Sequence, residues 1–440
     1  MSIQAKTLDL IPQNFLPSSI KFEDEFYTDI DSVRSSGIPK YVEIKNAIKR
    51  EKKVKILFAG HTGSGKSTEL NRLVSEIHKQ YAVVKFSVKE TNDPFTLQYE
   101  DLLVSSINKV LEFLNDYKDF PFKELDSKIL EEFNNWFFST EKIKEIVSST
   151  DISTEAGLQG KLPFLSILNI YTKLSLKLKL SGKEKVIYKQ DLQKNFTQLL
   201  NISKKLLSNI EELLQKEIIL IIEDLDKIDT QKAKEIFIEN NVIISEIPLT
   251  TIYTVPIFLM HSTEMSSLNG NVYRNILLPM IKTRTKNSYK EEYPEGINKI
   301  KELVSKRMDI SLFEKEDDLN LLIIKTGGVF RDLFQVIVNA SESAIYNNRK
   351  QINFNDDIRY YLNIVKSSYY RALSGSSQRN ISPEDIITKL KELHEKNIIK
   401  PMAIDQIILE ALRLQVLIEY NGDGWYGLHP LVIEHLEDLE

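Results

Sequence analysis

The chain has 440 residues, of which 42% are apolar and 28% are charged, an ordinary composition for a globular protein of two or three domains. Its formal net charge of −5 provides no overall basic field for nucleic acid, and the lack of cysteine excludes disulfide bonds and thiolate metal sites. The sequence contains neither an apolar run of about 18 residues nor a basic-then-apolar leader, so we expect a cytoplasmic protein without a membrane span.

Short apolar runs alternate with helical patterns in the first part of the chain and again after residue 215. In chain order, the patterns predict an amphipathic helix at 41–49, a helix from Lys66 to about His78, and buried strands at 54–59, 82–88, 218–222, 250–255 and 275–281. Strands that alternate with helices favour a parallel sheet covered by helices on both faces. We therefore expect an α/β fold for the core.

Residues 95–215 interrupt this alternation and have a mostly helical pattern. The exception is 173–180, K-L-S-L-K-L-K-L, whose strict period of two predicts an amphipathic strand paired with 165–172 or with 153–162. Residues 161–205 hold ten lysines and two acidic residues, a net charge of +8. Solvated helix and strand faces explain this charge. A docking surface for a neighbouring subunit or for nucleic acid is the alternative.

From about residue 291 the pattern becomes helical. Helices are predicted at 291–308, 315–325, 328–346 and 354–373, before a Ser-Gly-Ser-Ser linker at 374–377. The last 60 residues predict two helices, a hairpin of strands 416–420 and 425–428 around an Asn-Gly-Asp-Gly turn, and a final helix. We expect three domains: a core at 1–290 with an insertion at about 95–215, a helical domain at 291–375, and a small domain at 381–440.

A phosphate-binding loop lies between the first predicted strand and the helix after it. Residues 60–67, G-H-T-G-S-G-K-S, fit G-x-x-x-x-G-K-[ST], in which glycines let successive backbone N–H groups turn toward phosphate oxygens. The helix N-terminus adds partial positive charge. Lys66 is expected to reach the β- and γ-phosphates, and the Ser67 hydroxyl to ligate Mg²⁺. The predicted nucleotide-binding residues are Gly60, His61, Thr62, Gly63, Ser64, Gly65, Lys66, Ser67 and Thr68.

Two adjacent carboxylates follow a buried strand later in the chain. The run I-I-L-I-I at 218–222 leads into Glu223 and Asp224. The carboxyl ends of such strands meet the ligand crevice of an open α/β sheet. One acid is expected to hold Mg²⁺, and the other to orient and help deprotonate the attacking water. An acidic helix cap is the alternative interpretation, for which Asp226 is a candidate.

Residues 218–227 resemble the h-h-h-h-D-D-L-D-[KR] strand of STAND and KAP-type P-loop ATPases, which are relatives of the AAA+ proteins. The resemblance implies ATP and Mg²⁺ as ligands, with Glu223 assisting Mg²⁺ and Asp224 as the catalytic carboxylate. Glutamate at the first acidic position departs from the family pattern. Its longer side chain shifts the metal or exchanges the two roles, so we expect slow turnover.

Two further segments extend the resemblance. Residues 250–260 are similar to a sensor-1 strand, in which Thr254 faces the γ-phosphate, although a buried strand end explains this threonine equally well. Residues 326–333, T-G-G-V-F-R-D-L, are similar to the start of the lid helix in AAA+ and origin-recognition-type ATPases, which makes Arg331 the sensor-2 arginine. A surface arginine at a helix N-terminus is the alternative. Arg274 and Arg284 are candidates for an arginine finger.

The last predicted domain resembles the winged helix that follows the lid in these ATPases. The resemblance invites a DNA-binding hypothesis, but residues 381–440 hold five basic and twelve acidic residues, a net charge of −7. Because phosphate contacts dominate affinity for nucleic acid, such a domain repels DNA. We interpret it as a structural or protein-binding winged helix.

These features lead to three hypotheses about function. In the first, the protein is a homo-oligomeric switch in which ATP holds the lid and winged helix against the core and hydrolysis releases them. It then acts with a separate partner or effector protein and, by resemblance, in bacterial antiviral defence or stress signalling. The second is a DNA-handling AAA+ ATPase, such as an origin-recognition-like loader or a transposition regulator. The third is a nucleotide-bound scaffold that scarcely hydrolyses ATP.

Overall fold

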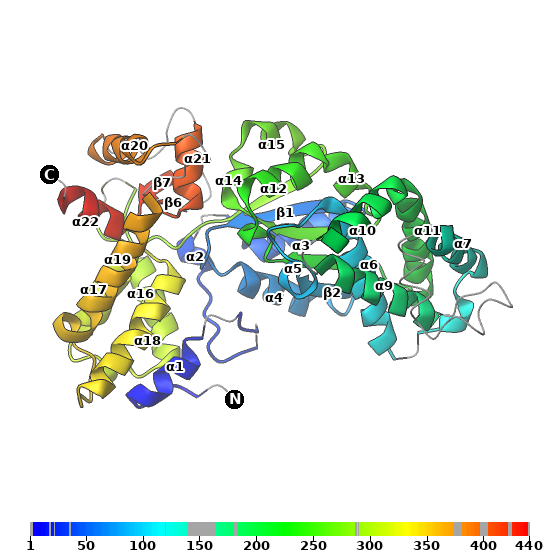
Figure 1. The fold of residues 1–440 in the computed structure, drawn as a ribbon. Coiled ribbons are helices and arrows are strands. Elements are labelled where there is room, and N and C mark those ends of the chain that lie inside the picture. The colour runs from blue at the N-terminus through cyan, green and yellow to red at the C-terminus, as the bar shows by residue number, and fades with distance from the viewer. Residues whose placement is uncertain are drawn as a thin grey trace.

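The computed structural model places an α/β core between two largely helical parts of the molecule (Figure 1). It describes residues 3–16, 19–21, 23–34, 37–118, 120–139, 164–179, 183–286, 288, 290–373, 381–396, 404–420 and 425–438. In Figure 1 the insertion, coloured cyan to green, lies at one end of the core, and the C-terminal helices, coloured yellow to red, lie at the other. The sheet therefore occupies the middle of the molecule.

The core contains a five-stranded parallel sheet with the strand order β2-β3-β4-β1-β5. Its strands are β1 (Lys55–Gly60), β2 (Ala82–Ser87), β3 (Ile218–Glu223), β4 (Thr250–Val255) and β5 (Arg274–Leu278). The five predicted strands are thus confirmed, with small shifts at their ends. Because β4 lies between β1 and β3, the carboxyl ends of these three strands meet at one edge of the sheet.

Both faces of the sheet are buried. Leu57, Leu220 and Tyr253 belong to the larger apolar core, on the face toward the insertion. Ile56 and Ile221 belong to the smaller core on the opposite face. A sheet that is covered on both faces needs strands that are apolar throughout. This is why β3, with its unbroken apolar run at Ile218–Ile222, gave a clear strand signal, whereas β2 at the edge of the sheet alternates buried and half-buried residues.

Helices cover each face of the sheet. The smaller core lies under α3 (Lys40–Arg50) and α4 (Lys66–Ile77). The larger core lies under α6 (Tyr99–Asp116) and α11 (Phe196–Leu214). The short helices of the core are α5 (Val88–Thr91), α12 (Thr230–Lys234), α13 (Asn241–Glu246), α14 (Ile257–Met260) and α15 (Thr263–Leu268). Among all helices of the described residues, none combines the length and the apolar character that crossing a bilayer requires.

The insertion is helical, and the strand predicted at 173–180 is wrong. Besides α6 and α11, it contains α7 (Ser127–Ser139), α9 (Phe164–Lys179) and α10 (Lys183–Lys194), so α9 covers 173–179. The buried residues of α9 recur at helical spacing: Ile167, Ile170, Tyr171, Leu174 and Leu178. Leu176, which completed the period of two, is 57% exposed. The helical stripe of buried residues begins at Ile167, before the alternating segment, and continues through it as part of α9. The proposed partner strand at 153–162 lies outside the described residues.

The C-terminal half follows the predicted order of elements. Its first helices are α16 (Pro294–Arg307), α17 (Glu316–Thr326), α18 (Phe330–Tyr346) and α19 (Arg359–Leu373). Two helices, an antiparallel hairpin and a last helix follow: α20 (Pro383–Glu395), α21 (Gln406–Arg413), β6 (Leu417–Tyr420), β7 (Trp425–Leu428) and α22 (Pro430–Asp438). All of these share one apolar core. The linker at 374–377 and the turn at 421–424 lie outside the described residues.

The N-terminal segment packs against the C-terminal half rather than against the sheet. Ala5 pairs with the chain at the end of α16 and just beyond it. The Ala5 N–H donates to the Arg307 carbonyl oxygen at 2.8 Å, and the Asp309 N–H donates to the Ala5 carbonyl oxygen at 2.8 Å. Phe15, just after α1 (Ile11–Asn14), makes an edge-to-face contact with Phe334 of α18. The chain then returns through α2 (Asp31–Arg34) to the core. The first residues therefore bridge the two halves, a placement that local patterns did not predict.

Candidate nucleotide site

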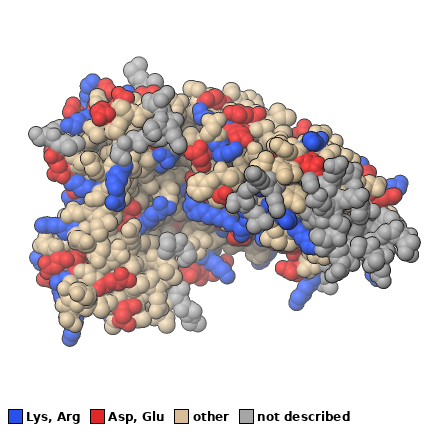
Figure 2. Space-filling view, viewed as in Figure 1, with Lys and Arg blue, Asp and Glu red and all other residues tan. Residues whose placement is uncertain are grey.

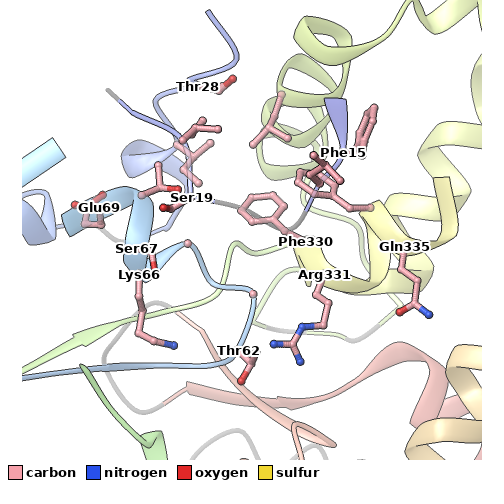
Figure 3. A pocket seen from close by; sticks show the side chains of 18 of the residues that line it. Phe15, Ser19, Thr28, Thr62, Lys66, Ser67, Glu69, Phe330, Arg331 and Gln335 are labelled. Atoms are coloured by element: carbon pink, nitrogen blue, oxygen red, sulfur yellow. The ribbon is translucent and has the colours of Figure 1, made fainter. Parts of the chain in front are cut away.

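A cavity of about 630 Å³ lies where the P-loop faces the N-terminus of α18. Its wall comes from the P-loop, the turn after β3, α18 and the N-terminal segment. Figure 3 shows Thr62, Lys66 and Ser67 on one side and the rings of Phe15 and Phe330 on another. One end of the cavity is thus rich in polar loop atoms, and the other is lined by aromatic rings.

The conformation of the P-loop depends on its glycines. Gly63 and Gly65 adopt φ angles of +79° and +91°, which side chains other than glycine rarely tolerate. A Cβ atom on Gly63 would lie 3.2 Å from the backbone nitrogen of Arg331. The loop therefore packs directly against the first turn of α18. Of the predicted loop residues, Thr62, Gly63, Gly65, Lys66, Ser67 and Thr68 line the cavity.

Lys66 begins α4 and lies inside the loop. Its side chain is 7% exposed, and its Nζ donates hydrogen bonds to the carbonyl oxygens of Gly60 at 2.8 Å and His61 at 3.1 Å. Nζ also forms an ion pair with Asp226 at 2.9 Å. These three protein oxygens fix the Lys66 ammonium at the P-loop, where the Asp226 carboxylate balances its charge.

Asp224 stands at the turn after β3 and lines the cavity. Its φ of 67° places it in the left-handed region, which aspartate and asparagine tolerate better than most residues. Its carboxylate accepts hydrogen bonds from the Ser87 hydroxyl at 2.5 Å and from Lys227. Burial raises the pKa of Asp224, but the hydrogen bonds from Lys227 and Ser87 outweigh burial and hold this pKa below its ordinary value. Asp224 is therefore an ionised, oriented acceptor at neutral pH.

The other two acids differ from their predicted places. Glu223 forms an ion pair with Lys85 of β2 at 2.9 Å and is not among the residues that line the cavity. Asp226, interpreted from sequence as a candidate helix cap, lines the cavity and pairs with Lys66. The signal for Asp226 was present in the spacing D-L-D, because residues two apart in a tight turn can both face the ligand. The role of Glu223 at the metal stays a prediction.

The two predicted sensor residues both line the cavity. Thr254 lies at the end of β4, is 2% exposed, and donates its hydroxyl to the Ile222 carbonyl oxygen at 3.4 Å. Arg331 is in the first turn of α18, and Figure 3 shows its side chain extending toward the loop near Thr62. The structure thus brings a core strand and a C-terminal helix to the same phosphate-binding end.

The two candidate arginine fingers lie away from this cavity wall. Arg274 pairs with Glu51 at 2.6 Å and donates to the Gly270 carbonyl oxygen at 3.3 Å. Arg284 forms an isolated antiparallel bridge with Glu292. A finger acts on a neighbouring subunit, so both assignments stay predictions.

The hairpin of the C-terminal domain and Gln415, just before it, contact the P-loop itself. The Gln415 side-chain amide donates to the Thr62 carbonyl oxygen at 2.9 Å, and the Glu419 backbone N–H donates to Nε2 of His61 at 2.9 Å. The Tyr420 hydroxyl donates to the Gly327 carbonyl oxygen at 3.2 Å, just before α18. The side chain of His61, predicted to bind nucleotide, therefore holds the hairpin, while its carbonyl oxygen accepts from Lys66. No local sequence signal joined residues so far apart.

This contact predicts an acid-sensitive interface. Burial, followed by the charge of Lys66, lowers the pKa of His61 from 6.5 to about 3. Below pH 6.5 the His61 side chain is protonated in the unfolded chain but stays neutral in the folded protein. The contribution of neutral His61 to the unfolding free energy is therefore present above pH 6.5 and is lost as the pH falls toward 3. His61→Gln keeps an acceptor for Glu419 but does not titrate. Between pH 7 and pH 5 the wild type should lose about 2 kcal/mol of unfolding free energy relative to His61→Gln. The unfolding free energies are measured by urea unfolding at both pH values. An equal change between pH 7 and pH 5 in the two proteins would contradict this prediction.

The P-loop core matches a known family of domains. The model of the KAP family P-loop domain matches residues 36–254. Cdc6p from Pyrobaculum aerophilum is 12% identical, covering 94% of this chain and 98% of that one, with a TM-score of 0.37. Drosophila ORC bound to DNA is 11% identical, covering 99% and 91%, with a TM-score of 0.36. The RuvB Holliday junction branch migration motor of Thermotoga maritima is 12% identical, covering 55% and 83%, with a TM-score of 0.23. The comparison with curated proteins found no match.

Proposed function

Because residues 36–254 are a KAP family P-loop NTPase domain, we propose that the protein binds and hydrolyses ATP with Mg²⁺ and works as a molecular switch. The observation that carries the proposal is the convergence of Lys66, Asp224 and Arg331 on one cavity. They come from the loop after β1, the turn after β3 and the start of α18. A triphosphate that fills this end contacts the core and the C-terminal half at once.

The donor set fits nucleotide with Mg²⁺. Mg²⁺ commonly binds through one or two carboxylates together with substrate phosphates. Ser67, Asp224 and Asp226 line the cavity beside Lys66 and offer one hydroxyl and two carboxylates. We assign Asp226 to the Mg²⁺ side, because it contacts Lys66, and Asp224 to the attacking water. Bound Mg²⁺ neutralises charge on the β- and γ-phosphates.

The aromatic end of the cavity is the proposed base site. Phe15, Phe330 and Phe334 line it, and apolar and aromatic walls are typical of small-ligand sites. The Thr28 hydroxyl there is buried and has no hydrogen-bond partner among the described residues, so it can serve a base edge. We propose adenine over guanine, since the sequence lacks the N-K-x-D motif of guanine-specific proteins.

A switch also needs an element whose position depends on the nucleotide. The contacts of Gln415 with Thr62 and of the hairpin with His61 link the last domain to the P-loop. We propose the division into a core at 1–290, a lid at 291–375 and a winged-helix-like domain at 381–440. ATP would hold these parts together and hydrolysis would release them. We further propose that the protein forms a homo-oligomer and acts with a separate effector protein in defence or stress signalling.

Phosphate release and size-exclusion chromatography with light scattering test this proposal. With ATP and Mg²⁺ we expect slow phosphate release and a change in mass or shape that ADP does not produce. Ser67→Ala should lose Mg²⁺-dependent turnover. Millimolar ATP that neither raises the melting temperature nor releases phosphate would contradict nucleotide binding itself.

The basic insertion favours a second candidate, a DNA-handling ATPase. Figure 2 shows basic side chains along the middle of one face of the molecule, and residues 161–205 carry a net charge of +8. Two of these lysines are not surface charges, because Lys185 and Lys189 are 4% and 8% exposed and bind Thr96 and Asp101. A gel shift with duplex and single-stranded DNA decides between the candidates. Binding that needs ATP and weakens with salt would favour the second.

A further inference from the structure

Arg34 is a buried cation in the cavity wall with too few partners. It is 3% exposed, ends α2 and lines the cavity. Its Nη2 donates to the Ser64 carbonyl oxygen at 2.8 Å, whereas its Nε has no hydrogen-bond partner among the described residues. It forms no ion pair with a described carboxylate; Glu69 and Asp31 act on it at longer range. Because a guanidinium has five donors, such a site favours an anion.

The neighbours of Arg34 hold it in this place. Arg72 of α4 donates to the carboxylate of Asp31 at 2.8 Å and to the hydroxyl of Tyr27 at 2.7 Å. Asp31 begins α2, and Arg34 follows three residues later, one helical turn along. The helix that begins at the P-loop therefore fixes the backbone from which Arg34 extends.

Arg34 and Arg331 flank the P-loop at two of its glycines. A Cβ atom on Gly65 would lie 3.6 Å from Nη2 of Arg34, and one on Gly63 would lie 3.2 Å from the Cβ of Arg331. Tyr27 and Asp31, which precede Arg34, also line the cavity. Arg34 thus lies between the loop and the N-terminal part of the cavity, where we place the nucleoside.

Arg307 shows that a buried arginine in this cavity need not lack hydrogen-bond partners. It is 5% exposed and lines the same cavity. Its Nη1 donates to the carbonyl oxygens of Phe26 at 3.1 Å and Leu303 at 3.0 Å, and its guanidinium lies 5.3 Å from the Phe334 ring centroid. Because the partners of Arg307 all come from the protein, we interpret Arg307 as a structural residue.

We propose that Arg34 binds the α-phosphate of the nucleotide. The inference rests on the proposed function, because it places a nucleotide in this cavity. Lys66 serves the β- and γ-phosphates, so a guanidinium between the loop and the nucleoside meets the phosphate next to the ribose. Arg34 also lies outside residues 36–254, which match the KAP family P-loop domain. The N-terminal segment thus supplies a phosphate ligand that this domain does not contain.

Competition against a fluorescent ADP analogue tests this assignment with ADP, AMP and adenosine as competitors. For Arg34→Met we expect affinities for ADP and AMP that fall roughly 10- to 100-fold, with adenosine unchanged. Arg34→Lys should lose less, because it keeps the charge without the planar fork. The melting temperature of nucleotide-free Arg34→Met should not fall, since the substitution removes a buried, poorly paired charge.

Arg307→Met is the matched control: it should lower the melting temperature and weaken the three competitors by one common factor. The same common factor for Arg34→Met, or no change, would overturn the inference. Loss of ADP affinity with unchanged AMP affinity would overturn the α-phosphate assignment. Failure of the wild type to bind ADP would instead refute the proposed function, so the two failures are distinguishable.

Discussion

Replacing Lys66 with alanine is expected to weaken ATP binding by at least roughly 100-fold. The ammonium is 7% exposed and is the cation inside the P-loop. Its loss removes a charge-assisted contact to the phosphates and leaves Asp226, its partner at 2.9 Å, as an uncompensated anion facing them. Isothermal titration with ATP and Mg²⁺ measures the effect.

Lys55 provides the matched control for this substitution. It is 3% exposed and lies at the opposite end of β1, where its Nζ donates to the carbonyl oxygens of Lys53 at 2.8 Å and Leu249 at 2.6 Å. Lys55→Met should therefore change stability and leave nucleotide affinity intact. Equal ATP affinity in wild type and Lys66→Ala would show that the loop is not the phosphate site.

Asp224→Asn is expected to reduce phosphate release by roughly 10²- to 10⁴-fold while ATP binding is retained. The carboxylate is oriented by Ser87 and Lys227, and asparagine keeps the shape but loses the charge that orients and polarises a water. Asparagine also tolerates the left-handed backbone at this position, where φ is 67°, so the substitution adds little strain. Single-turnover phosphate release and light scattering should show lost hydrolysis with ATP-dependent assembly preserved.

Asp226→Asn separates the two carboxylates. Since Asp226 contacts Lys66, its substitution should weaken Mg²⁺-dependent binding as well as turnover. Near-normal turnover in Asp224→Asn together with lost turnover in Asp226→Asn would reverse the two roles. Glu223→Gln should have the smallest effect of the three, because Glu223 pairs with Lys85 outside the cavity wall.

Local patterns predicted most of the core but failed where two periods overlapped. The P-loop between β1 and α4 could be predicted because its glycines and lysine are required by phosphate chemistry at fixed spacing. The alternation at 173–180 predicted a strand, yet the structure forms α9, because Ile167 and Ile170 extend a helical stripe into that segment. A period of two over a few leucines does not distinguish a strand from a helix unless the flanking residues are considered as well.

The contacts at the candidate site that sequence reasoning missed join residues that lie far apart along the chain. Asp226 contacts Lys66 across 160 positions of sequence, His61 accepts from Glu419, and Arg34 donates to Ser64. Each of these residues also has an ordinary local explanation as a turn, loop or surface residue. Only their convergence at the carboxyl edge of the sheet distinguishes them.

By itself, the sequence determined the P-loop and the α/β architecture, because the P-loop and the buried strands are properties of short contiguous segments. Only the tertiary structure decided which carboxylate contacts Lys66, that His61 contacts the hairpin, and that the N-terminal segment lines the cavity beside α18. The physical reason is that side-chain pairing across the cavity depends on how strands, loops and the C-terminal half pack together, and no local period carries that information.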